Sequence, residues 1–281
     1  MAVVYPGSQV RYDCMVRQVR ALREDECAGI ATPRIMEADY PQILRRMGMA
    51  IRSSFEPFPL GAFRYATLDC CKPSYVPAAS GACMMVRKEV FKKIGRFDEN
   101  YMLCWEDVEF SFRATVNGFR CLYEPDAVVY ESNTSIMDPW SRLNVYHRCR
   151  GTLPTAMKYL PDETLIQQCN DLLLKHMKNA FIYYGCGGRL ITALKGKWAG
   201  FQLAREIYKK RKAGIIDEAE ETKKNESQAE KTPERLKEEQ KARDKKKKKK
   251  ADLLERNLLR GDRLWKASRD SGDRFHLETK R

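Results

Sequence analysis

Three carboxylates lie within five residues in the segment Trp105–Glu109, which contains Glu106, Asp107 and Glu109. Carboxylates this close raise one another's pKa unless a cation neutralises them. Arg113 follows Glu109 by four residues and can pair with it if the segment is helical. A carboxylate with a raised pKa is suited to take a proton from a hydroxyl group, and we expect Asp107 to act as a general base. The alternative is that the three acids only occupy the exposed first turn of a helix, where the helix dipole favours negative charge.

The acidic cluster lies inside a longer pattern of fixed spacing. Ser80-Gly-Ala82 and Phe97-Asp-Glu99 precede it, and the segment Tyr123–Tyr130 follows it. Together these segments resemble, nearly position for position, the acceptor-side half of the family 2 glycosyltransferases of the rhamnosyltransferase-like kind, over roughly residues 75–150. The resemblance implies an inverting transfer of a sugar from a nucleotide-sugar donor to a hydroxyl of a cell-surface glycan or a lipid-linked acceptor.

The resemblance also implies a role for individual residues. It makes Asp107 the general base that deprotonates the acceptor hydroxyl, with Glu106 beside it to position the acceptor. The substrate contacts that it implies fall on Gly81, Ala82, Asp98, Trp105 and Glu109. A glycine at position 81 lets the backbone approach a ligand closely, although a tight turn explains it equally well.

The chain departs from the family pattern at two places. Where the family commonly has a metal-binding histidine after the strand at 127–130, this chain has Glu131, whose carboxylate can still ligate Mg²⁺ or Mn²⁺. The resemblance places the nucleotide-binding half of the family, with its acidic D-x-D metal motif, before Ala2. The leaving diphosphate depends on that metal for electrostatic stabilisation, so we expect the 281 residues alone to have little activity.

Hydrophobic patterning divides the chain into three regions. Residues 1–150 are expected to form the acceptor-side, catalytic half of a GT-A (nucleotide-diphospho-sugar transferase) domain, a partial three-layer α/β/α fold with a mostly parallel sheet. Residues 151–215 are expected to form basic amphipathic helices that fit a membrane surface. Residues 216–281 are dominated by charged side chains and predict a helical or disordered tail.

Local patterns predict the main elements of the first two regions. Short apolar runs predict strands at 2–5 and 127–130, and apolar spacing predicts helices at 10–23, 87–94, 162–184 and 190–208. Gly95 is expected to close the helix at 87–94. The proline-rich segment 51–77 is expected to be a long irregular connection.

Composition limits the class of protein. The ten cysteines include no C-x-x-C metal pair. With no signal peptide ahead of them, they indicate a reducing, cytoplasmic compartment. We also expect peripheral contact at the inner face of the cell membrane. The net charge of +14 allows a nucleic-acid-binding alternative, but the charge is spread along the chain, so no specific nucleic acid is expected as a partner. A second alternative is a noncatalytic partner or membrane-surface protein derived from a transferase.

Overall fold

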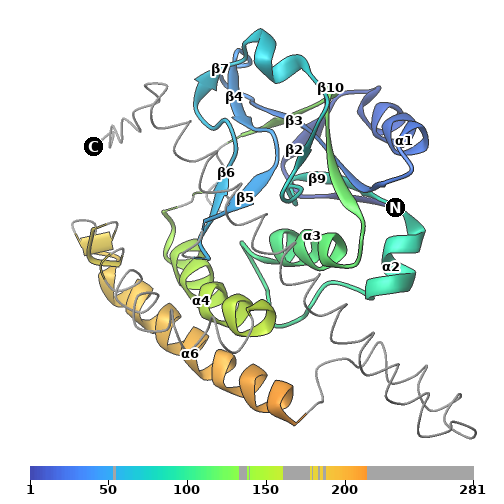
Figure 1. Cartoon of the computed structure of the whole chain (residues 1–281). Helices are drawn as coiled ribbons and strands as arrows, with labels where there is room; N and C mark the ends of the chain where they lie inside the picture. The colour runs from blue at the N-terminus through green and yellow to red at the C-terminus, as the bar shows by residue number, and fades with distance from the viewer. Residues whose placement is uncertain are drawn as a thin grey trace, which may run out of the picture.

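The computed structural model describes residues 1–52, 55–132, 138, 140–160, 178, 180–182, 184–185 and 188–213. The predicted helix at 162–184 lies largely outside these residues, and the predicted tail at 216–281 lies wholly outside them. Within the described ranges the chain forms a central sheet with helices on both of its faces (Figure 1). The predicted α/β fold class is therefore confirmed.

The central sheet has the strand order β1-β9-β3-β10-β2, with β8 paired to β10, β4 paired to β3 and β7 paired to β4. Two further strands, β5 and β6, form a small antiparallel ribbon. The strands are β1 (Ala2–Val4), β2 (Ser8–Val10), β3 (Ala28–Glu37), β4 (Ile43–Arg46), β5 (Met49–Ile51), β6 (Pro57–Pro59), β7 (Arg64–Tyr65), β8 (Ser74–Val76), β9 (Cys83–Val86) and β10 (Arg120–Glu131).

The expectation of a mostly parallel sheet is wrong for the described strands. Only β3 and β10 run parallel, and every other pairing among these strands is antiparallel. A parallel pair needs a long crossover, which α2 and α3 provide between β3 and β10, whereas an antiparallel neighbour needs none. The many short strands are added antiparallel to the two long ones, and the apolar runs alone carried no information about direction.

Alternate residues of the long strands enter two different cores. Ile30 and Cys121 face one core together with α2 (Lys88–Ile94) and α3 (Glu106–Val116). Their neighbours Ala31 and Leu122 face the opposite core with α1 (Cys14–Glu24). This alternation follows from the two-residue period of a strand, and it places the sheet between two helical layers (Figure 1).

Two local predictions changed at their boundaries, and a third is confirmed. The helix predicted at 10–23 begins only at Cys14, because Ser8–Val10 pair with β10 as strand β2. The predicted connection at 51–77 is not wholly irregular, since it contains β6, β7, β8 and the 3-10 helix η1 (Leu68–Cys71). The helix at 87–94 and its closing glycine are confirmed, with Gly95 at a φ of 77°.

Two long helices form the outer layer on the side of α3: one lies next to α3, and the other packs against the first (Figure 1). They are α4 (Arg142–Tyr159) and α6 (Leu190–Lys212), and the predicted boundary at residue 150 falls inside α4. Gly196 and Gly200 of α6 lie against the backbone carbonyls of Tyr146 and Arg150, where a side chain on either glycine would overlap the carbonyl oxygen. Glycine thus permits the close approach of the two helices.

None of the helices in the described part of the chain is long and apolar enough to span a bilayer.

The eight cysteines in that part are all free. Cys27 and Cys71 are exposed, whereas most of the others are buried.

Candidate active site

The acidic cluster begins α3, and a strained turn sets the direction of that helix. Cys104 has a φ of 71°, a left-handed conformation that a residue with a side chain seldom adopts. Trp105 follows as the N-cap; its side chain is fully buried and its indole N–H donates to the carbonyl of Arg148 at 2.9 Å. The turn and the buried indole together fix the first turn of α3, in which Glu106 and Asp107 stand.

Asp107 is held by backbone N–H groups. Its Oδ2 accepts from the N–H of Gly81 at 2.6 Å, and its Oδ1 accepts from the N–H of Val108 at 2.7 Å. Burial, and next the negative charge of Glu106, raise the pKa of Asp107 to about 6, although the two backbone bonds act in the opposite direction. A carboxylate with this pKa is ionised at neutral pH and is a stronger base than an ordinary aspartate.

Gly81 is needed for this contact. A Cβ at position 81 would lie 2.8 Å from the Tyr5 ring and 3.1 Å from Asp107 Oδ2. Ala82 adds to the same turn, since its carbonyl accepts from the N–H of Tyr5 and the hydroxyl of Ser8, each at 3.1 Å. The structure therefore brings the predicted Gly81 and Ala82 together with Asp107.

Glu106 makes a contact that the sequence motif did not reveal. Its Oε1 accepts a hydrogen bond from the Tyr5 hydroxyl, and its Oε2 accepts from the N–H of Trp105 at 3.0 Å. Burial, followed by the charge of Glu106, raises the pKa of Tyr5, so the phenol stays protonated and donates. Tyr5 is 101 residues from Glu106 in the chain, and only the β1–β9 pairing brings the two close.

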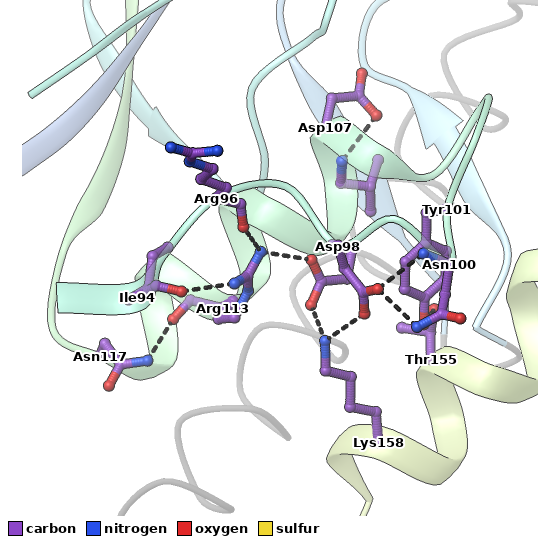
Figure 2. A network of polar contacts seen from close by, with 12 residues as sticks. Ile94, Arg96, Asp98, Asn100, Tyr101, Asp107, Arg113, Asn117, Thr155 and Lys158 are labelled. Atoms are coloured by element: carbon purple, nitrogen blue, oxygen red, sulfur yellow. Dashed lines mark hydrogen bonds and ion pairs between the residues drawn. The ribbon is translucent and has the colours of Figure 1, made fainter. Parts of the chain in front are cut away.

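Glu109 lies in a buried polar network between α3 and α4, and Figure 2 shows Asp98, Arg113 and Lys158 of this network. Its carboxylate is fully buried and accepts from Lys158 Nζ at 2.5 Å, from the Tyr159 hydroxyl at 2.5 Å and from Arg113 at 3.1 Å. The predicted pairing of Glu109 with Arg113 is confirmed. The reading of the cluster as an exposed helix terminus is wrong for Glu109, and its burial also argues against the predicted substrate contact.

Asp98 joins the same network. Lys158 Nζ donates to Asp98 at 2.9 Å, and the backbone and side-chain N–H groups of Asn100 donate to its other oxygen. Burial acts to raise the pKa of Asp98, but the Lys158 ammonium and these bonds outweigh it and hold the pKa below its usual value. Asp98 and the buried Trp105 both support the base of α3 here. Their predicted contacts with substrate stay predictions.

Glu131 lies at the end of β10, beside two arginines of β4. Its Oε2 accepts from Arg45 Nε at 3.0 Å and from Arg46 Nη2, and Arg45 Nη1 also donates to Glu37 at 2.6 Å. Glu37, Arg45 and Glu131 are all buried. The strand pairings β3–β4 and β3–β10 bring these four side chains together.

The residues around Glu131 do not fit the predicted Mg²⁺ or Mn²⁺. One oxygen each of Glu37 and Glu131 has no hydrogen-bond donor, which on its own favours a cation. However, two guanidinium groups already neutralise the two carboxylates, and a divalent ion bound there would lie beside both positive charges. In addition, no three potential metal-binding side chains gather anywhere in the part of the chain that the structure describes.

Comparisons with known proteins agree with the motif. Residues 16–148 match the family described as glycosyltransferase like family 2. The chain is 34% identical over 91 residues to N-acetylglucosaminyl-diphospho-decaprenol L-rhamnosyltransferase of Mycobacterium tuberculosis, which covers 31% of this chain and 29% of that protein. It is 36% identical over 81 residues to low-salt glycan biosynthesis hexosyltransferase Agl10 of Haloferax volcanii, covering 26% of each.

A crystal structure of GalNAc-T7 with UDP, GalNAc and Mn²⁺ superposes with a TM-score of 0.43 at 15% identity, covering 57% of this chain and 32% of that chain. The chain spans less than a third of the length of the two curated relatives it matches.

Proposed function

Residues 16–148 form a family 2 glycosyltransferase domain, and on this premise we propose that the chain transfers a sugar from a nucleotide-sugar donor to a hydroxyl of a glycan or lipid-linked acceptor. The two relatives are named as a rhamnosyltransferase acting on a lipid-linked sugar and as a hexosyltransferase of glycan biosynthesis. These names support the substrate classes of the proposal.

The observation that carries the proposal is the carboxylate of Asp107, which two backbone N–H groups hold and whose pKa is raised. The acceptor oxygen attacks C1 of the donor sugar while Asp107 takes the hydroxyl proton, and the nucleoside diphosphate leaves with the electron pair of the C1–oxygen bond. Attack from the face opposite the leaving group inverts the configuration at C1. The two backbone bonds orient the Asp107 carboxylate, and each of its oxygens keeps a lone pair for the incoming proton.

Glu106 is proposed to position the acceptor, as the sequence predicts. Tyr5 holds one oxygen of Glu106 and limits the movement of the side chain. The predicted divalent cation has no step in this proposal, because the carboxylate expected to bind it is already neutralised by Arg45 and Arg46.

The experiment compares two substitutions of aspartate by asparagine. We predict low but measurable sugar transfer by the 281-residue chain when it is supplied with a nucleoside-diphospho-rhamnose donor and with N-acetylglucosaminyl-diphospho-decaprenol, the acceptor in the name of the M. tuberculosis relative. Loss of general-base catalysis in Asp107→Asn is expected to lower kcat/KM by a factor of about 10² to 10⁴. Asp126→Asn, which removes an exposed carboxylate 3.4 Å from Arg17, is the matched control and should keep the wild-type rate.

The outcomes separate the base from the function as a whole. Wild-type rates in Asp107→Asn contradict the assignment of the base. If the wild-type chain transfers no sugar, either from nucleoside-diphospho-rhamnose or from other nucleoside-diphospho-hexoses, the result contradicts the proposed function of these 281 residues and favours the noncatalytic alternative.

The outer face of α6 supports peripheral membrane contact at the cytoplasmic side, which we propose as the place of action. Trp198 and Phe201 are exposed and stack with ring centroids 5.9 Å apart. Exposed lysine and arginine side chains flank them at Lys195, Arg205 and Lys209. Aromatic rings between basic side chains match an anionic lipid surface.

Vesicle sedimentation tests this contact. The wild-type chain is expected to sediment with phosphatidylglycerol vesicles and much less with phosphatidylcholine vesicles, and the double variant Trp198→Ala/Phe201→Ala should lose most of the binding. Tyr40→Ala, another exposed aromatic, is the control. Equal binding of the double variant and the wild type, or tighter binding to duplex DNA than to either vesicle, contradicts the proposed surface.

A further inference from the structure

We propose that Arg46 supplies the positive charge that binds the diphosphate of the donor, at the place where the family resemblance predicts a divalent cation. This inference rests on the proposed transferase function. It names a side chain of this chain that contacts the leaving group, and a ligand class, a diphosphate, that Arg46 recognises.

The two neighbouring arginines of β4 are used differently. Arg45 is buried, with its side chain 9% exposed, and it bridges Glu37 at 2.6 Å and Glu131 at 3.0 Å. Arg46 is 18% exposed and contacts only one of these acids, Glu131. Arg45 and one edge of the Arg46 guanidinium therefore together neutralise the negative charges of Glu37 and Glu131.

Arg46 retains unused donors. Its Nη2 donates to Glu131, whereas its buried Nε has no hydrogen-bond partner in the structure. A guanidinium group has five N–H donors in a planar fork, and the fork matches two oxygens of a phosphate group. A buried donor without a partner is costly, so a ligand oxygen that accepts from it is stabilised there.

Arg46 is also close enough to act on the residues around the base. Burial and the charge of Glu106 raise the pKa of Asp107, and the positive charge of Arg46 opposes them. Arg46 likewise lowers the pKa of Cys104, which precedes the first turn of α3, although burial and other charges raise it overall. Strand pairing places Arg46 opposite Ile35, three residues along β3 from Thr32, whose hydroxyl accepts from the N–H of Ser80 beside Gly81.

This placement suits the leaving group of the proposed reaction. Negative charge develops on the diphosphate as the bond to C1 breaks, and a fixed cation stabilises that charge without reorganisation. Glu131 acts here as a positioning residue, because its carboxylate holds the Arg46 side chain.

Inorganic pyrophosphate is the probe, since it carries the diphosphate without a sugar or a base. Isothermal titration of the 281-residue chain at pH 7.5 in EDTA is expected to show binding. Arg46→Gln should weaken the binding at least tenfold, and Arg46→Lys should restore part of it because the charge remains. Arg20→Gln removes an exposed arginine paired with Glu24 on α1 and should bind as the wild type does.

Glu131→Gln distinguishes diphosphate binding by Arg46 from binding through a metal ion held by Glu131, because the two predict opposite changes in the affinity for pyrophosphate. It keeps an amide oxygen that can accept from Arg46 but removes the negative charge beside it, so pyrophosphate should bind more tightly, whereas loss of a metal ligand would weaken binding. It also covers the case in which Arg46→Gln does not fold, which circular dichroism at increasing temperature would reveal.

Three results would overturn the inference: pyrophosphate binding that requires added Mg²⁺ or Mn²⁺, binding that Arg46→Gln leaves unchanged, and no binding by the wild type with or without metal. The titration contains no sugar and no acceptor, so its result does not depend on sugar transfer. Absence of sugar transfer would contradict the proposed function but not the binding of pyrophosphate by Arg46. Absence of pyrophosphate binding would contradict the role of Arg46 but not the assignment of Asp107 as the base, which has its own test.

Discussion

Asp107→Asn is expected to make the protein more stable at neutral pH while it removes the catalytic base. The folded-state pKa of about 6, against 3.8 for an ordinary aspartate, means that ionised Asp107 opposes folding by about 3 kcal/mol. Asparagine has no such cost. Its side-chain oxygen can still accept from the Gly81 N–H, but its amide nitrogen cannot accept from the Val108 N–H. The loss of that hydrogen bond offsets about 1 kcal/mol of the gain in the free energy of unfolding.

The sign of the pH dependence follows from proton binding. Between pH 3.8 and 6 the folded wild type binds more protons at Asp107 than the unfolded chain does, so its stability falls as the pH rises through this window. The cost of ionised Asp107 is about 1 kcal/mol at pH 4.5 and about 3 kcal/mol at pH 7.5. The stability advantage of Asp107→Asn should therefore grow by about 2 kcal/mol between the two pH values.

Urea unfolding followed by circular dichroism at pH 4.5 and pH 7.5 measures this difference. Asp126→Asn, with its exposed ion pair, is expected to change the free energy of unfolding by less than about 0.5 kcal/mol at both pH values. A stability difference between Asp107→Asn and wild type that is the same at both pH values, or that shrinks as the pH rises, would refute the reasoning.

Two further substitutions test the supports of α3. Glu109→Gln is expected to lower the free energy of unfolding by about 3 kcal/mol, because it leaves the partly buried Lys158 and Arg113 without their shared, fully buried acid; urea unfolding checks this against Glu24→Gln, an exposed pair expected to cost less than about 0.5 kcal/mol. Gly151→Ala is expected to cost about 2 to 3 kcal/mol, since its Cβ would overlap the Trp105 ring, whereas Gly185→Ala meets no neighbouring atom within 4 Å and should be nearly neutral in the same assay.

The sequence predicted the features that depend on neighbouring residues. The pairing of Glu109 with Arg113 and the end of α2 at Gly95 follow from helical spacing and from the freedom of glycine, which both act within a few residues. The fixed spacing of the motif from Ser80 to Tyr130 pointed, for the same reason, to the family whose model matches residues 16–148.

Features that depend on distant pairing were not predicted. Strand direction in the sheet depends on pairings between separate segments of the chain. The strand at Ser8–Val10, in place of a helix start, is decided by β10, more than a hundred residues away. Tyr5 and Arg46 reach the site only through β1 and β4, and neither belongs to the motif. The acids of the motif differ in their partners for a similar reason. Lys158 of α4 donates to Asp98 and Glu109, whereas Asp107 accepts from the N–H of Gly81.

The pH dependence of kcat/KM for sugar transfer tests the central claim most directly. With Asp107 as the base, kcat/KM of the wild type should fall about tenfold per pH unit below about pH 6. Glu106→Gln keeps the oxygen that accepts from Tyr5 but removes the negative charge that raises the pKa of Asp107, so the break in its profile should move to lower pH. A wild-type profile that is flat from pH 5 to pH 8, or a break that Glu106→Gln leaves in place, would contradict the account.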